Sequence, residues 1–390
     1  MSEKSESLWG NLASRYEKSQ PRKILALDGG GIRGVLTLEI LLKIENDLKE
    51  KLGKGDDFRL SDFFDYFGGT STGAIIATGL SIGMSVQELL DFYTEKGKDM
   101  FDKTFLLKRW RSFYESGPLL NMLQQTFGKD TDLDLNNGKF RSLLLVVTMN
   151  RSTDSPWPIS NNPLAKYNNK SRPDCNLKIK LHQLVRASTA APAYFPPETL
   201  EWDKNDPSKT FVFVDGGVTP YNNPAFLLYK MATHPAYNLN WETGEDKLLV
   251  VSVGTGSATS EGDYGNLVNT LKELPNNLMY TMQLDQDINC RLMGRCTYGA
   301  HIDRELDDMI TKEVDGTLTP LSKNTNKNFL YVRYNADLSQ KGLDAIGLNN
   351  IVSSEVRQMD NVKYIDKLRQ VGKETAKRQV DTAHFGSFVK

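Results

Sequence analysis

The feature that most constrains this 390-residue chain is a set of short apolar segments that each run directly into a glycine-rich turn. The segments cover residues 23–27, 211–214 and 247–253. Short apolar runs bounded by glycines are typical of buried strands. Residues 37–52, after the first turn, have the apolar spacing of a helix. Strands that alternate with helices predict an α/β fold with a mostly parallel central sheet and helices on both faces.

The pattern changes beyond about residue 260. Residues 267–293 have helical spacing, and residues 329–334 (FLYVRY) form one strand-like run. Apolar residues recur every three or four positions over 352–371, which predicts one long amphipathic helix. Earlier in the chain, residues 151–176 are rich in Ser, Asn, Pro and Lys and predict a long loop.

These patterns divide the chain into three expected parts. They are a polar N-terminal arm over residues 1–20, an α/β domain over 21–258, and a mainly helical C-terminal region over 259–390 that packs on or completes that domain.

Composition removes several classes of protein. The chain has 48 Lys and Arg against 49 Asp and Glu, so its net charge of −1 gives no overall attraction to nucleic acid or to an anionic membrane. Three cysteines cannot build a disulfide framework, and there is no CxxC pair for a structural metal. The longest apolar runs have the length of strands, and the N-terminus has no signal-like apolar core. We therefore expect a cytoplasmic protein that binds no nucleic acid polymer.

The strongest local motif is G-T-S-T-G, from Gly69 to Gly73, with Ser71 at its centre. It lies between an apolar segment at residues 63–67 and a helix of small residues at 74–84. That context is typical of a nucleophile elbow, a sharp turn that exposes a reactive serine above a sheet. An ordinary Gly/Ser turn is the structural alternative, but the flanking segments favour a catalytic serine.

A second motif, D-G-G-G-I-R-G, follows the first strand, and its Gly29, Gly31 and Gly34 fit the G-x-G-x-x-G spacing of a dinucleotide or phosphate loop. A Rossmann site also needs an acidic residue at the end of a second strand, but the acidic residues at 45–50 lie on an expected helix. The loop could instead point its N–H groups at an oxyanion, with Arg33 as a nearby positive charge.

The third motif is Asp215-Gly216-Gly217, at the end of an apolar strand, where a carboxylate can reach into a crevice above the sheet. Ser71 requires a base, and both a histidine triad and a Ser–Asp dyad fit the residues present. No histidine has a supporting local motif. The four are scattered at His182, His234, His301 and His384.

The three motifs in this order resemble the patatin-like phospholipase family. A fourth block, R-A-S-T-A-A-P-A-Y-F-P at residues 186–196, agrees with it. The resemblance covers about residues 22–257 and implies a three-layer α/β/α fold and a serine acyl hydrolase that needs no metal or other cofactor. It implies Ser71 as the nucleophile and Asp215 as the base. It further implies an oxyanion hole, and the residues named for it are Gly29, Gly30, Gly31 and Arg33, within motifs that also contain Gly34, Gly69, Gly73, Gly216 and Gly217.

The resemblance also suggests partners. The expected substrate is a phospholipid or galactolipid at a membrane surface that the protein contacts transiently, and the basic-aromatic run of residues 103–111 is the candidate contact. Some bacterial members similar in size are defence effectors switched on by a cyclic nucleotide. An anionic activator of that kind could bind the C-terminal region, where the basic candidates are Arg291, Arg295, Arg304 and Lys312. A homo-oligomer is compatible with the sequence. The alternative function is a non-catalytic nucleotide- or lipid-binding module that uses the glycine loop.

Overall fold

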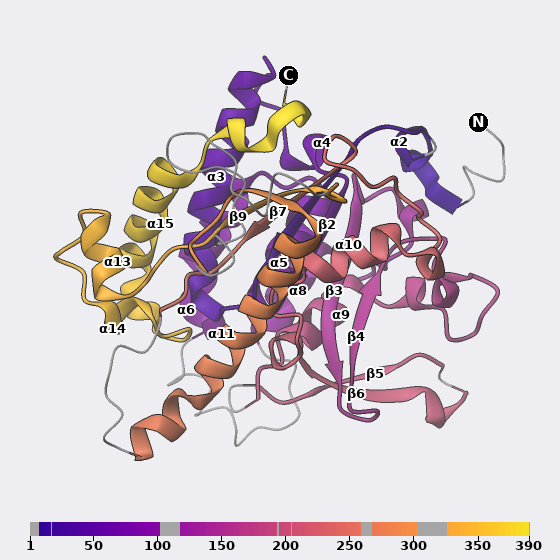
Figure 1. Ribbon diagram of the computed structural model, residues 1–390. Coiled ribbons are helices and arrows are strands. Elements are labelled where there is room, and N and C mark those ends of the chain that lie inside the picture. Colours follow the sequence, from indigo (N-terminus) through magenta and orange to yellow (C-terminus); the bar gives the residue numbers. More distant parts are fainter. Residues whose placement is uncertain are drawn as a thin grey trace.

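The computed structural model describes residues 8–16, 18–101, 118–192, 195–203, 205–258, 267–302 and 326–389. Within these ranges the chain builds one sheet of nine strands (Figure 1). The strands are β1 (Arg22–Leu27), β2 (Tyr66–Thr70), β3 (Leu143–Asn150), β4 (Ser155–Ser160), β5 (Glu198–Glu201), β6 (Thr210–Asp215), β7 (Leu248–Val253), β8 (Arg295–Tyr298) and β9 (Leu330–Tyr334).

The strand order is β5-β6-β3-β2-β1-β7-β9-β8, and β4 pairs with β3 off this path. The strands from β3 to β8 in this order are parallel, whereas β4, β5 and β6 are attached by antiparallel pairings. The chain moves from β1 to β2 and β3 on one side and returns to β7 on the other. The carboxyl ends of β1, β2 and β7 therefore meet near a switch in strand order, where α/β proteins commonly bind ligands.

Helices cover both faces of the sheet, which makes the fold the expected three-layer α/β/α arrangement (Figure 1). Helices α3 and α5 pack on one face, and α10 packs on β1, β2 and β7. The helices are α2 (Ala13–Tyr16), α3 (Gly34–Lys51), α4 (Leu60–Phe63), α5 (Thr72–Ser81), α6 (Val86–Phe101), α8 (Pro118–Phe127), α9 (Leu181–Ser188), α10 (Ala225–Thr233), α11 (Leu267–Met293), α13 (Gln340–Ala345), α14 (Ser353–Val356) and α15 (Ile365–Gln379).

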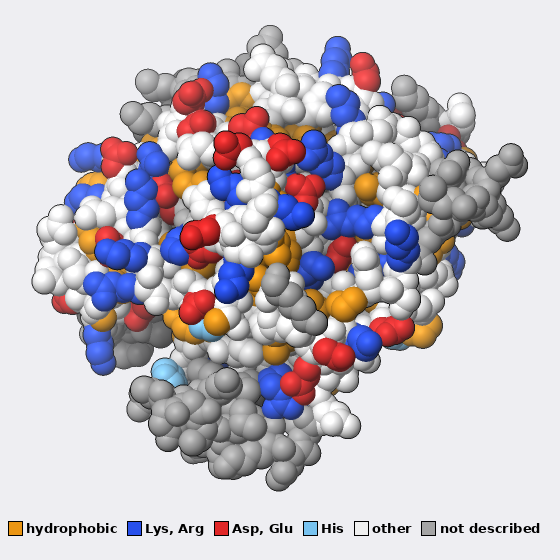
Figure 2. Space-filling model, turned by 90° about the horizontal axis from the view of Figure 1, so that it is seen from above, with side chains coloured by type: hydrophobic (Ala, Val, Ile, Leu, Met, Phe, Trp, Pro, Cys, Tyr) orange, Lys and Arg blue, Asp and Glu red, His pale blue; other side chains and the backbone are white. Residues whose placement is uncertain are grey.

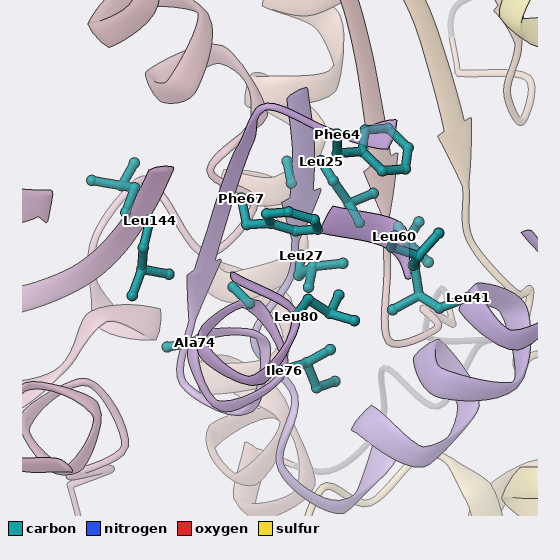
Figure 3. Packing of buried hydrophobic residues seen from close by; sticks show 14 of the residues in the cluster. Leu25, Leu27, Leu41, Leu60, Phe64, Phe67, Ala74, Ile76, Leu80 and Leu144 are labelled. Carbon is teal, nitrogen blue, oxygen red and sulfur yellow. The ribbon is translucent and has the colours of Figure 1, made fainter. Parts of the chain in front are cut away.

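The core lies between the sheet and its helices. Leu25 and Leu27 of β1 and Phe67 of β2 pack near Ile76 and Leu80 of α5, and all five side chains are fully buried (Figure 3). The six residues of β7 are also buried throughout, as expected for an interior parallel strand that is covered on both faces. This rigid centre fixes the strand ends from which the site residues project.

The structure corrects several boundaries. The expected loop at 151–176 contains β4, because the residues after a short turn pair with β3. The expected polar arm is packed over residues 8–16, where Trp9 and Leu12 are buried. The expected long helix at 352–371 is two helices, α14 and α15, separated by a non-helical segment at residues 357–361 and a short 3-10 helix, Val362–Tyr364.

Strands β8 and β9 come from the C-terminal region and extend the same sheet beyond β7. Helix α15 packs on α3, and α11 packs on β8 and β9, so this region also contributes to the helical layers of the fold.

The surface agrees with the balanced charge of the chain. Acidic and basic side chains are interspersed over the face seen in Figure 2. Within the described ranges, no helix combines the length and apolar character needed to cross a membrane.

Candidate active site

Ser71 occupies a strained turn between β2 and α5. Its backbone has φ 55° and ψ −122°, a conformation that L-residues rarely adopt and that costs about 1–3 kcal/mol. The turn is tight: a Cβ at Gly69 would lie 2.0 Å from the carbonyl oxygen of Gly73, and a Cβ at Gly73 would lie 2.3 Å from that of Leu27. Glycine is therefore required on both sides of Ser71, as the sequence motif indicated.

The register of the sheet places Ser71 and Asp215 next to each other at the same edge of the sheet. Thr70 pairs with Val147 of β3, and the next residue of β3, Thr148, pairs with Asp215 at the end of β6. The Ser71 hydroxyl donates a hydrogen bond to Oδ2 of Asp215 at 2.6 Å. The two residues are 144 positions apart in the chain, and the sheet brings them into direct contact.

The environment of Asp215 changes its proton affinity. The residue is 5% exposed, and burial raises the pKa of its carboxyl group to about 6. The hydrogen bonds from Ser71 and from the Gly217 amide, at 2.7 Å, and the positive charge of Arg186 oppose this rise in pKa. A carboxylate with a raised pKa is a better base at neutral pH than an exposed one.

Ser188 fixes the backbone of Ser71 and was not singled out from the sequence. Its hydroxyl accepts a hydrogen bond from the Ser71 N–H at 2.9 Å and donates one to the carbonyl oxygen of Val147 at 2.7 Å. The residue ends α9 within the R-A-S-T-A-A-P block. The sequence analysis identified this block as a family motif. It could not indicate that Ser188 contacts Ser71 and Val147, because those contacts depend on the folded structure.

The glycine loop adjoins Ser71, since a Cβ at Gly29 would lie 3.3 Å from Cβ of Ser71. The Gly29 N–H donates to the carbonyl oxygen of Asn222 at 3.1 Å and is therefore already engaged. In the described part of the chain, the N–H groups of Gly30 and Gly31 have no hydrogen-bond acceptor. Two of the three expected glycine amides can thus donate a hydrogen bond to a ligand oxygen.

Comparisons with known proteins identify the family to which the chain belongs. A family model described as "Patatin-like phospholipase" matches residues 25–229, just over half of the chain. The chain belongs to the patatin-like phospholipase family. Patatin-17 from Solanum cardiophyllum is 30% identical over 253 residues, which are 62% of this chain and 61% of that protein. Patatin-15 from Solanum tuberosum is 28% identical over 247 residues, 60% of each chain.

The chain thus covers about three fifths of the length of these patatins. Among solved structures, VipD from Legionella pneumophila matches 90% of this chain and 67% of that chain, at 11% identity and a TM-score of 0.36. The family assignment rests on the family model, and it leaves residues 230–390 of this patatin-like protein unmatched.

Arg33 lies in the glycine loop of this patatin-like chain. It is partly buried, and its guanidinium donates to the carbonyl oxygen of Arg357 at 3.2 Å. Burial lowers the pKa of Arg33 to about 10, with the charge of Asp28 opposing that change, so Arg33 stays protonated at neutral pH. The side-chain hydrogen bond of Arg33 thus connects the glycine loop to the C-terminal region.

In the described part of the chain, no hydrogen bond joins a histidine side chain to the side chain of Ser71 or Asp215. In the described ranges, the side-chain hydrogen bonds of Ser71 and Asp215 join them to each other and to the Gly217 amide. His182 contacts Gln124, and His384 contacts the hydroxyl of Tyr334. Of the alternatives left open by the sequence, the geometry favours a Ser–Asp pair.

The residues suggested for regulation are only partly placed. Arg291 is buried and forms an ion pair with Asp287 at 2.9 Å, and Arg295 pairs with Glu245. Both cations therefore already have carboxylate partners. Arg304, Lys312 and residues 103–111 lie outside the described residues, so the activator site and the membrane contact stay predictions.

Proposed function

We propose that this protein is a serine acyl hydrolase that cleaves fatty-acyl esters of membrane lipids through Ser71 and Asp215. The observation that carries the proposal is the 2.6 Å hydrogen bond from the Ser71 hydroxyl to Asp215, made from a strained turn at the start of a helix. Membership of the patatin-like phospholipase family supports the lipid ester as substrate.

In the first half of the reaction, Asp215 removes the Ser71 proton while Oγ attacks the ester carbonyl carbon. The tetrahedral intermediate collapses as the bond to the alcohol oxygen breaks, and Asp215 returns the proton to that oxygen. The products of this half are the free alcohol, here the lysolipid or headgroup-bearing glycerol, and an acyl ester on Ser71.

In the second half, Asp215 takes a proton from a water molecule as the water oxygen attacks the acyl-enzyme. Collapse of the second intermediate releases the fatty acid and leaves the proton on Ser71. Each half uses Asp215 once as a base and once as an acid, so no second titrating group is needed.

The oxyanion of both intermediates needs hydrogen-bond donors. We assign this role to the free N–H groups of Gly30 and Gly31, with the positive end of the α5 dipole beside Ser71 as a further stabilising charge. Arg33, expected from the sequence to take part, is better described as a nearby positive charge, because it is bonded to Arg357.

The non-catalytic alternative explains the glycine loop but leaves the strained serine and its buried carboxylate without a role. Such features are destabilising and cluster at functional sites. We therefore favour the enzyme. Contact with a membrane surface, a cyclic nucleotide activator and a homo-oligomer remain predictions from the sequence and are not needed for this mechanism.

The test uses purified full-length protein with vesicles of phosphatidylcholine, phosphatidylglycerol and a galactolipid. We expect release of fatty acid, and labelling of Ser71 by a fluorophosphonate probe located by peptide mass spectrometry. Ser71→Ala should abolish both, and Asp215→Asn should lower the hydrolysis rate by about 10³-fold or more.

A soluble short-chain ester serves as the control for lipid access, since it needs no membrane contact. Hydrolysis of both substrates that persists in Ser71→Ala would contradict the proposed nucleophile. An intact, folded wild type that neither labels nor hydrolyses either substrate would favour the binding module instead.

A further inference from the structure

The glycine loop begins at a buried ion pair with the C-terminal region. Arg333 of β9 contacts both carboxylate oxygens of Asp28, at 2.8 Å to Oδ1 and 2.5 Å to Oδ2. Asp28 is 1% exposed and Arg333 is 5% exposed. Asp28 is the first residue of the D-G-G-G-I-R-G motif, whereas Arg333 lies outside the residues 25–229 that match the family model.

The sheet register explains how these distant residues meet. Arg333 of β9 pairs with Ser252 of β7, and Ser252 pairs in turn with Ala26 of β1. The guanidinium therefore reaches across β7 toward the end of β1, and it also donates to the Ser252 hydroxyl at 2.6 Å. The planar fork of arginine suits such a bidentate contact, and it fixes the orientation of the carboxylate as well as its position.

The peptide group that follows Gly29 in the loop is held by a residue just after β7. The hydroxyl of Thr255 donates to the carbonyl oxygen of Gly29 at 2.9 Å, while the Gly29 N–H bonds to Asn222. Asn335, two residues after Arg333, accepts a hydrogen bond from the Gly256 N–H at 2.8 Å. The end of β9 thus supports the turn that contains Thr255.

The C-terminal region also holds the far side of the loop. The Ile32 N–H donates to the carbonyl oxygen of Met359 at 2.8 Å, and Arg33 donates to that of Arg357. Gly31 has φ +59°, and a Cβ there would lie 2.2 Å from the Met359 oxygen. The free amides of Gly30 and Gly31 therefore sit between two anchored points, Asp28 and Ile32.

A buried ion pair is weak evidence for stability, because desolvation of both charges offsets most of their attraction. Its geometry, by contrast, fixes a chain segment in one orientation. We propose that Arg333 is a positioning residue that holds the Asp28–Ile32 loop with its free amides aimed at the developing oxyanion. This inference rests on the proposed acyl-hydrolase function and assigns part of the catalytic apparatus to the region outside the family model.

The principal test is Arg333→Met in the full chain, assayed on a soluble short-chain ester. Displacement of oxyanion donors typically costs about 10²–10³-fold in kcat. We expect kcat to fall by roughly 10²-fold while KM changes by less than about threefold, and the rate of fluorophosphonate labelling at Ser71 to fall in parallel. Arg333→Lys keeps the charge without the fork and should recover part of the lost kcat.

The matched control is Arg15→Met. Arg15 also pairs with a buried aspartate, Asp65, at 3.0 Å, but this pair lies at the opposite end of β1. We expect its melting temperature to fall while kcat, measured well below that temperature, stays within about twofold of the wild-type value. If kcat fell only because the protein was destabilised, it would fall in both Arg333→Met and Arg15→Met.

The outcomes separate this inference from the proposed function. An active wild type whose Arg333→Met variant keeps its kcat would overturn the positioning role alone. A folded wild type that neither hydrolyses the ester nor labels at Ser71 would overturn the proposed function and, with it, this inference. Should Arg333→Met not fold, Arg333→Lys decides, because an unchanged kcat in that folded variant would also overturn the role of the fork.

Discussion

At the scale of single residues, the candidate dyad combines two destabilising features. Ser71 has a positive φ, and Asp215 is buried with its pKa raised to about 6. Neither feature improves packing, and the fold retains them because the sheet and α5 determine the backbone on both sides of the turn. Activity and stability therefore depend on the same carboxylate in opposite ways, which can be measured.

The first expected effect concerns the pH dependence of activity. Asp215 must be deprotonated to accept the Ser71 proton, so its active form is lost as pH falls through its pKa. We expect kcat/KM on a soluble ester to be half-maximal near pH 6, with a one-proton slope on the acidic side. A midpoint near 4, the value for an exposed carboxyl group, would contradict the raised pKa.

A histidine could produce a similar profile, because its ordinary pKa is close to 6.5. Alanine variants of the four histidines are therefore the controls. Each should keep substantial activity and the same midpoint, since the described structure joins Ser71 to Asp215 and not to a histidine. A loss greater than about 10²-fold in one folded variant would favour a triad.

The second expected effect is on stability. With its pKa raised from 3.8 to about 6, Asp215 stays protonated in the folded chain over a pH range in which the unfolded chain releases that proton. Stability therefore falls as pH rises through this range, by up to about 3 kcal/mol. Asp215→Asn removes the ionisation and should be the more stable protein at pH 7.5.

Urea unfolding at pH 4.5 and 7.5 measures this difference. The advantage of Asp215→Asn should be small at the lower pH and should grow at the higher one. Ser71→Ala is the control, because it removes the hydrogen bond but keeps the carboxyl group, and it should show no such gain. An Asp215→Asn protein that is less stable than wild type at pH 7.5 would contradict the argument.

At the scale of elements, local patterns predicted the segments that end in glycine turns. The strands β1, β6 and β7 and the helix at residues 267–293 lie close to their expected positions, and so does β9. Each of these segments has a regular apolar pattern, and the secondary structure that its local sequence prefers is the one found in the folded chain. The sequence singled out Ser71 and Asp215 for the same reason.

The prediction of one long helix at residues 352–371 was wrong because the apolar spacing continues through a segment whose backbone is not helical. Spacing over 352–371 continues through residues 357–361, but the chain leaves helical geometry there and presents the carbonyl groups of Arg357 and Met359 to the glycine loop. Periodicity reports burial, and a non-helical segment can be buried as well. No pattern in the sequence indicates that this segment contacts residues more than 300 positions earlier.

The supporting residues were missed for a related reason. Ser188, Thr255 and Arg333 each contact a partner that is distant in the sequence and is brought close by the tertiary fold. A single sequence shows which residues can donate a hydrogen bond but not which strands are neighbours. The motifs that contain Ser71 and Asp215 could be recognised in the sequence, whereas the residues that contact them could be identified only from the folded structure.

At the scale of the whole molecule, the boundary near residue 258 divides the sequence but not the sheet. β9 pairs with β7 over Leu249–Val253, and β8 extends the sheet further. Helix α15 covers α3, and Arg369 forms an ion pair with Glu39 at 2.7 Å. The C-terminal region therefore shares the hydrophobic core of the family-matched part.

This sharing predicts the behaviour of a chain that ends at residue 258. Without β9, the buried strand β7 becomes an edge with unpaired backbone groups and exposed apolar side chains, a typical aggregation site. Asp28 also loses Arg333, and an unpartnered buried charge costs about 3–5 kcal/mol. Because whole domains are stable by only about 5–15 kcal/mol, we expect the fragment to be insoluble or to lack a cooperative thermal transition.

The control is full-length Ser71→Ala, expressed and melted in parallel, because it removes any toxicity that the hydrolase activity causes during expression. A soluble 1–258 fragment that melts cooperatively would show that the two regions fold independently.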